Sequence, residues 1–123
     1  MDKKVLKAAI LDYSTDAVVE QRVFSDAISV DVLRLSGNEQ LYSLDAISEY
    51  DFILLWHSMT LNKAVLDRLN NCKAISRIGN GYDNVDIVYA GKLGIPVFNV
   101  PDYGTNDVAD HAFALLLALT RSI

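Results

Sequence analysis

The sequence predicts a doubly wound α/β fold, in which about five parallel strands alternate with helices. Short apolar runs of strand character recur along the chain, and segments with helical spacing of apolar residues lie between them. The strand segments carry few polar residues, as expected of strands buried on both faces of a parallel sheet. Connections between the segments are short, which is typical of this class. The expected strands are residues 5–11, 28–35, 51–56, 74–78 and 95–100.

Four helices are expected between these strands, because apolar residues recur there with a helical period. The last of the four ends at Gly94, since glycine readily adopts the left-handed conformation that terminates helices. The four segments are residues 17–24, 41–47, 61–69 and 85–93.

The segment from Thr105 to Ile123 is expected to be the longest helix. Pro101 cannot continue the preceding strand, and Thr105 is the expected N-cap. Asp107 in the first turn and Arg121 in the last complement the helix dipole. The middle of the segment, AFALLLAL, is apolar almost all the way round, which is typical of a helix surrounded by protein. Little chain remains to surround it, so we expect further structure to be missing.

Composition and charge narrow the class of protein. The chain has 123 residues, enough for one domain, of which 51% are hydrophobic and 22% charged. Eleven Lys and Arg against sixteen Asp and Glu give a net charge of −5, which argues against nucleic acid or a membrane surface as partner. A single cysteine, Cys72, permits no intramolecular disulfide, and with His57 and His111 it is too little for a zinc site. We expect a cytoplasmic protein without a bound metal.

A glycine loop, RIGNGYDNVD at residues 77–86, raises the question of nucleotide binding. Gly79 and Gly81 supply the first two glycines of a G-x-G-x-x-G fingerprint, but Asn84 replaces the third. The fingerprint belongs after the first strand of a dinucleotide-binding unit, whereas this loop follows the fourth expected strand. The dinucleotide interpretation therefore fails.

The same loop is suited to a small anion. Open parallel sheets bind ligands at the carboxyl ends of their strands, where this loop lies. The backbone N–H groups of Asn80, Gly81 and Tyr82 are expected to point outward and to bind a carboxylate or a phosphate. In the alternative, the glycines only shape a turn, and Asp83 and Asn84 cap the next helix. Residue types alone leave both interpretations open.

Two more side chains are expected at this edge. His57 follows the third strand, but nothing in the sequence pairs it with an acid or base, so a structural role is the alternative. Arg77 lies one residue inside the end of the fourth strand and faces either a ligand anion or a surface acid. A phospho-receiver interpretation of Asp12, Asp16 and Asp51 is weak, because the third strand ends in Leu-Leu-Trp-His-Ser rather than in an aspartate.

Residues 57–69, HSMTLNKAVLDRL, and residues 77–121, RIGNGYDNVDIVYAGKLGIPVFNVPDYGTNDVADHAFALLLALTR, resemble the N-terminal part of the D-2-hydroxyacid dehydrogenases. The likeness is greatest to members similar to the C-terminal-binding-protein corepressors. In that family a basic residue and an apolar one precede G-x-G-[FYT]-D-N-[IV]-D. The pattern continues with A-G/A-x-x-x-G-I-x-V-x-N-x-P and ends with V-A-[DE] at the start of a helix. Four ordered segments over about half of the chain are more specific than one glycine motif.

The resemblance implies a two-domain oxidoreductase, dependent on NAD or NADP, that interconverts 2-oxoacids and D-2-hydroxyacids. Residues 1–103 would form a flavodoxin-like substrate-binding domain, although residues 1–55 fit the family only as generic α/β sequence. Residues 104–123 would form a hinge helix that leads into a cofactor domain absent from this chain.

Matching positions imply the roles of individual residues. The backbone of Asn80 and Gly81 would hold the substrate carboxylate, and His57 and Arg77 would line the pocket. Asn80 and Val108 would approach the nicotinamide. Members that bind phosphorylated hydroxyacids have arginine at the position of His57, so the identity of the substrate is left open.

The family's nucleotide fingerprint and its catalytic arginine, glutamate and histidine have no counterpart here, and neither His57 nor His111 fills the histidine position. The resemblance therefore implies no catalytic residue in this chain, no cofactor bound to it alone, and a homodimer for the complete protein. The alternative is a non-enzymatic, corepressor-like or scaffold module of the same fold. A natural standalone module is less consistent with an exposed apolar helix.

Overall fold

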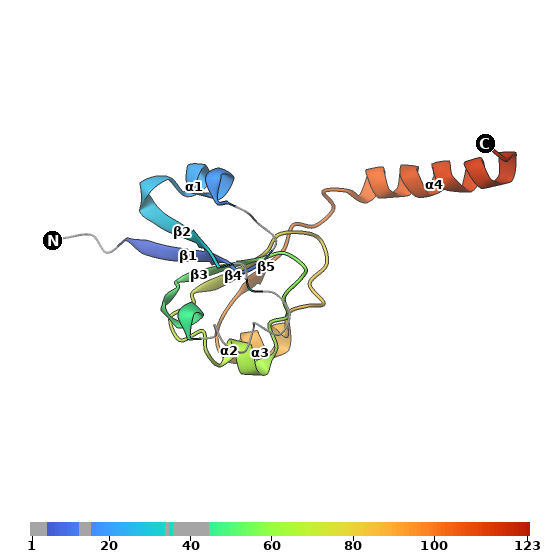
Figure 1. The fold of residues 1–123 in the computed structure, drawn as a ribbon. Helices are drawn as coiled ribbons and strands as arrows, with labels where there is room; N and C mark the ends of the chain where they lie inside the picture. The colour runs from blue at the N-terminus through green and yellow to red at the C-terminus, as the bar shows by residue number, and fades with distance from the viewer. Residues whose placement is uncertain (1–4, 13–15, 34, 36–44) are drawn as a thin grey trace.

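A computed structural model describes residues 5–12, 16–33, 35 and 45–123 and confirms the α/β class (Figure 1). A five-stranded parallel sheet has the order β2-β1-β3-β4-β5. All five expected strands are present, and the two-residue edge strand β5 is the most shortened. The strands are β1 (Leu6–Ile10), β2 (Ile28–Val32), β3 (Phe52–Leu55), β4 (Ala74–Arg77) and β5 (Val97–Phe98).

Helical segments lie between the strands and after the last strand, where the sequence predicts them. The segments are α1 (Val18–Phe24), η1 (Ser25–Ala27), η3 (Ala46–Glu49), α2 (Lys63–Leu66), α3 (Ile87–Lys92) and α4 (Thr105–Arg121). The helix expected at residues 41–47 falls mostly outside the described residues; its last two residues, Ala46 and Ile47, begin the 3-10 helix η3.

The sheet is wound on both faces, with α1 on one side and α2 and α3 on the other (Figure 1). The larger core lies beneath α2 and α3, where strand residues Ile53, Leu55 and Ile75 are fully buried. A smaller cluster on the α1 side is built on Ala8, Ile10 and Leu54, with Phe24 and other partly buried residues packed against it. Burial of each such aliphatic side chain contributes about 1.5–3 kcal/mol, so apolar contact is the main force that holds the layers together.

Gly94 ends α3 as predicted. It adopts a φ of 73°, which is in the left-handed region that glycine tolerates best. Its N–H donates to the carbonyl of Gly91, and the N–H of Ile95 donates to that of Ala90 at 2.9 Å. This pair of bonds is the Schellman arrangement, which satisfies carbonyls that the end of a helix would leave unpaired.

The expected helix starts are wrong at two places. The cap of α3 is Asp86, whose carboxylate accepts from the N–H of Tyr89 at 2.9 Å, rather than Asp83 or Asn84. Thr105 is the first residue of α4 rather than its N-cap, and its hydroxyl contacts Asp102 instead. The N-cap positions are thus Asp86, two residues after Asn84, and Gly104, one residue before Thr105.

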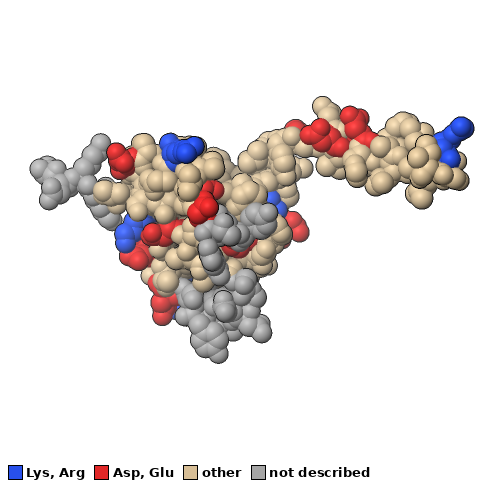
Figure 2. Space-filling model, turned by 45° about the horizontal axis from the view of Figure 1, so that its top comes forward, with Lys and Arg blue, Asp and Glu red and all other residues tan. Residues whose placement is uncertain are grey.

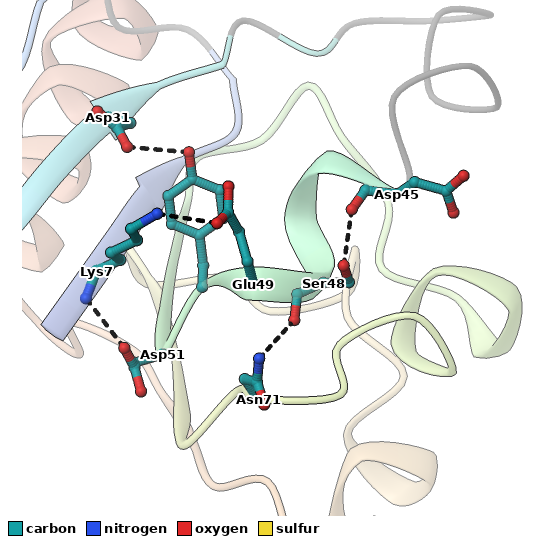
Figure 3. A network of polar contacts seen from close by, with 8 residues as sticks. Lys7, Asp31, Asp45, Ser48, Glu49, Asp51 and Asn71 are labelled. Atoms are coloured by element: carbon teal, nitrogen blue, oxygen red, sulfur yellow. Dashed lines mark hydrogen bonds and ion pairs between the residues drawn. The ribbon is translucent and has the colours of Figure 1, made fainter.

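A group of polar contacts surrounds the segment that precedes β3 (Figure 3). The Lys7 side chain pairs with Glu49 at 2.9 Å, and the Lys7 N–H donates to Asp51 at 3.0 Å. Asp51 is almost fully buried and also pairs with Lys73. The hydroxyl of Tyr50 donates to Asp31 on β2 at 3.0 Å. These contacts connect β1, β2 and β4 to the segment that precedes β3.

α4 projects away from the sheet (Figure 1). On the face shown in Figure 2, most of the helix is uncharged, between acidic residues near its start and a basic residue at its end. Within residues 105–123 only Ala118 is partly shielded, and Leu119 is 80% exposed. The surroundings that this apolar helix requires are therefore not supplied by the described part of the chain. No helix in that part is long and apolar enough to cross a membrane.

Candidate functional site

The register of the sheet brings two loops together at its carboxyl edge. Leu55 at the end of β3 pairs with Arg77 at the end of β4. The N–H of Ile78 donates to the carbonyl of Leu55 at 2.7 Å. His57 and Gly79 each follow two residues after these paired positions, so the His57 loop and the glycine loop emerge side by side. This is the edge at which open parallel sheets bind ligands.

The glycine loop is held by its carbonyl groups. The N–H of Val100 donates to the carbonyl of Gly79 at 3.0 Å, and the side-chain amide of Asn99 donates to that of Asn80 at 2.8 Å. Gly79 is buried and has a φ of 151°, a conformation that other residues rarely adopt. The loop is thus fixed by the segment that follows β5.

The N–H groups of the same loop are available to a ligand. Those of Asn80, Gly81 and Tyr82 form no hydrogen bond to any described residue, and all three residues are exposed. Successive backbone N–H groups without partners are the donors that bind anions in loops of this kind. The geometry therefore has what the anion interpretation requires.

Arg77 lies beside these donors. Its Nη1 donates to the carbonyl of Ile78 at 3.0 Å, and its Nε is buried without a hydrogen-bond partner among the described residues. It forms no ion pair with a described carboxylate, which is the arrangement that the alternative interpretation required. The guanidinium is thus held at the loop with donors remaining for an anion.

His57 lies on a loop whose backbone N–H groups donate hydrogen bonds to Asp12. The Asp12 carboxylate, only 1% exposed, accepts from the N–H groups of Trp56 and Ser58, both at 2.6 Å, and of Met59 at 3.0 Å. The side chain of His57 itself is exposed. Asp51 lies at the opposite end of the sheet, so Asp12 and Asp51 do not form the phospho-receiver site considered above.

A cavity of ≈ 420 Å³ separates the glycine loop from the start of α4. Asn80 and Val108, the two residues for which the family resemblance implies a cofactor contact, both line it. The remaining lining residues are Tyr103, Gly104, Thr105, Ala109 and Ala112. Among the described residues, no group of three or more His, Cys, Asp and Glu could hold a metal ion.

Residues 9–122 match the family model described as the D-isomer specific 2-hydroxyacid dehydrogenase, catalytic domain. The chain belongs to this family. It is 31% identical over 105 residues to a D-3-phosphoglycerate dehydrogenase of Synechocystis, an alignment that covers 80% of the chain and 19% of that protein.

Solved structures agree on the fold of this family member. A 2-hydroxyacid dehydrogenase of Ketogulonicigenium vulgare superposes with a TM-score of 0.76 at 26% identity, over 98% of this chain and 37% of that one. A Thermus thermophilus protein, TT0316, gives 0.78 at 24% identity, over 95% and 37% of the two chains. The chain thus spans well under half of the relatives that it matches. The special likeness to corepressor members stays a prediction.

The roles of Asp12 and Asn84 are not apparent from the sequence. There Asp12 indicates only a weak receiver site, and Asn84 only a missing third glycine or a helix cap. In the structure the Asn84 side-chain amide instead donates to the carbonyls of Trp56 and Met59, at 3.1 and 2.8 Å. No local pattern indicates these contacts, because both residues contact a segment 25 or more positions away.

Proposed function

We propose that this chain is the substrate-binding part of an NAD- or NADP-dependent oxidoreductase that interconverts 2-oxoacids and D-2-hydroxyacids. The observation that carries the proposal is the row of unpaired N–H groups at Asn80, Gly81 and Tyr82, next to Arg77, in a member of this family. These groups would hold the substrate carboxylate.

A carboxylate suits these donors. Hydrogen bonds to an ionised acceptor are about twice as strong as neutral ones, and the bonds that hold the loop carbonyls orient the donors before the ligand arrives. Arg77 adds a positive charge beside these donors. With the carboxylate held by the backbone, the substrate's carbonyl carbon would face the cavity beside α4.

That cavity has a lining compatible with the flat, weakly polar ring of a nicotinamide, because Val108, Ala109 and Ala112 offer apolar contact and Asn80 offers a polar group. The nicotinamide would give or accept the hydride. The chain provides a contact surface for the ring only; the rest of the dinucleotide would bind to the cofactor domain. Residues 1–103 and 104–123 would then be the substrate domain and the hinge helix.

His57 would line the pocket on the side of the substrate's variable group. Imidazole has one positive charge at most and lacks the forked donors of arginine, so it is a weaker partner for phosphate. We therefore propose a 2-oxoacid without a phosphate group. The complete protein would act as a cytoplasmic homodimer.

The direct test is to express the complete open reading frame and follow nicotinamide absorbance with glyoxylate, pyruvate, hydroxypyruvate and 3-phosphohydroxypyruvate. Turnover of the unphosphorylated acids is expected, and a folded protein that reduces none of the four would contradict the proposal. Binding to the chain itself can be followed by NMR, where pyruvate should shift the amide resonances of Asn80, Gly81 and Tyr82 but not those of β2.

A corepressor-like or scaffold function is the second candidate. It would be favoured if the complete protein bound NAD(H) but reduced none of these acids.

A further inference from the structure

We propose that Asp12 and Asn84 are positioning residues. They fix the His57 loop (residues 56–60) and thereby determine which 2-oxoacid side chain the site accepts. The inference rests on the function proposed above and assigns a role to two residues that would not touch the substrate.

Asp12 fixes the N–H groups of the loop. Its two oxygens accept hydrogen bonds from the N–H groups of Trp56, Ser58 and Met59. Because the carboxylate is buried, water does not compete for these bonds. Hydrogen bonds to a charged group are stronger than ordinary ones. An acceptor of this kind leaves the loop backbone little freedom.

Asn84 fixes the carbonyl groups of the same loop. Its amide nitrogen bridges the carbonyls of Trp56 and Met59, the first and fourth residues of the loop. The backbone of Asn84 continues the connection, because its carbonyl accepts from the N–H of Leu61 at 2.8 Å. Asn84 therefore ties the His57 loop to the glycine loop that would hold the carboxylate.

The C-terminal end of the loop is also anchored in the core. Met59 and Leu61 are fully buried, whereas His57, Ser58 and Thr60 are exposed. The backbone is thus fixed from the strand end, from Asp12, from Asn84 and by apolar burial. A ligand at this edge would therefore meet the exposed side chains of the loop, of which His57 is the largest.

The position of Asp12 in the topology supports this role. In a sheet of this order the strand sequence reverses between β1 and β3, and ligands commonly bind at that point. Here the Asp12 carboxylate and the N–H groups of the His57 loop occupy it. The ligand position is thereby shifted to the ends of β3 and β4, and the His57 loop becomes one wall of the site.

Isosteric substitutions change the hydrogen-bonding groups of Asp12 and Asn84 without changing the size of either side chain. Asp12→Asn keeps the shape of the side chain but replaces one carboxylate oxygen by an NH2 group, which is a donor that faces the N–H groups of the loop. Asn84→Asp replaces the amide NH2 by an oxygen, which is an acceptor that faces the carbonyls of Trp56 and Met59. Asp51→Asn is the matched control, because Asp51 is a similarly buried carboxylate at the other end of the same sheet. All three variants would lower stability, but only the first two would displace the His57 loop.

Steady-state kinetics of the complete protein test the inference. In Asp12→Asn and Asn84→Asp, we expect KM for the preferred 2-oxoacid to rise about tenfold or more, with kcat within about threefold and KM for the nicotinamide cofactor unchanged. Asp51→Asn should lower Tm without changing any KM. In a His57→Ala background, Asp12→Asn should no longer alter the preference among 2-oxoacids, because the group that it positions is absent.

The outcomes separate this inference from the proposed function. A wild-type protein that reduces no 2-oxoacid would overturn both. A wild-type protein that turns over, with an unchanged KM in both variants or an equal rise in Asp51→Asn, would overturn the positioning role alone. Should Asp12→Asn not fold, Asn84→Ala gives the same comparison, since it removes both donors without adding charge. An unchanged KM in that variant would also overturn the role.

Discussion

The guanidinium of Arg77 lies over the α-carbon of Gly79, so closely that a Cβ at this position would overlap its Nη1. Gly79 also has a φ of 151°. The glycine therefore does two things at once: it allows the loop to turn, and it leaves the space in which the arginine side chain is held beside the unpaired N–H groups.

Gly79→Ala is expected to lower the free energy of unfolding by about 1–3 kcal/mol, because the backbone conformation is strained for any residue with a Cβ. It should also weaken binding of a 2-oxoacid, since Arg77 must swing away. Urea unfolding and an NMR titration with pyruvate measure the two effects. Gly91→Ala is the control: it lies inside α3 with open space around it, so it should stabilise the chain by about 0.5–1 kcal/mol. Equal effects of the two changes would contradict this account.

Tyr50 predicts a pH dependence. Burial, with a further contribution from its hydrogen bond to Asp31, raises the pKa of Tyr50 to about 12, above the ordinary value of 10.0. A raised pKa stabilises the fold fully below pH 10, and this contribution is lost as the pH rises through 12. Tyr50→Phe should therefore be less stable than wild type at pH 8 by about 1 kcal/mol.

The stability difference between the two proteins should shrink above pH 10. Urea unfolding of both between pH 8 and 11.5 measures it. A difference that stays constant across this range would contradict a raised pKa of Tyr50 in the folded chain.

The exposed face of α4 predicts self-association of the chain. Phe113, Leu115, Leu116 and Leu119 are each more than half exposed, an arrangement that is unfavourable for a monomer in water. Light scattering should show a dimer or larger species, and Leu116→Glu with Leu119→Glu should shift it toward monomer. Val23→Glu, at an equally exposed site on α1, should have no such effect. A monomer with α4 well ordered and shielded from solvent would contradict the prediction.

The isolated chain is expected to bind NAD(H) too weakly to detect at micromolar concentration. The cavity beside Val108 would contact only the nicotinamide ring, and the glycine loop does not follow the first strand as a dinucleotide site would. Isothermal titration calorimetry of the 123-residue chain measures this. Micromolar affinity would assign the loop to the nucleotide after all.

Residues whose roles are local were predicted well. The alternation of strands and helices follows from apolar periodicity, and Gly94 ends α3 because glycine has the lowest cost in the left-handed conformation. The helix caps predicted at Thr105 and Asn84 are wrong, because residue type alone does not identify the residue that caps a helix. Ser, Thr, Asn and Asp near a helix start are all suitable caps, and the sequence does not say which of them has the required backbone conformation.

The sequence by itself determined the class of the sheet, the family and the position of the glycine loop after the fourth strand, because each depends on residues close together in the chain. Only the tertiary structure decided the roles of Asp12 and Asn84. Each contacts the His57 loop at a sequence separation of 25 to 47 positions. A buried carboxylate or amide satisfies whichever unpaired groups the fold brings to it, and that pairing exists only once the strands are in register.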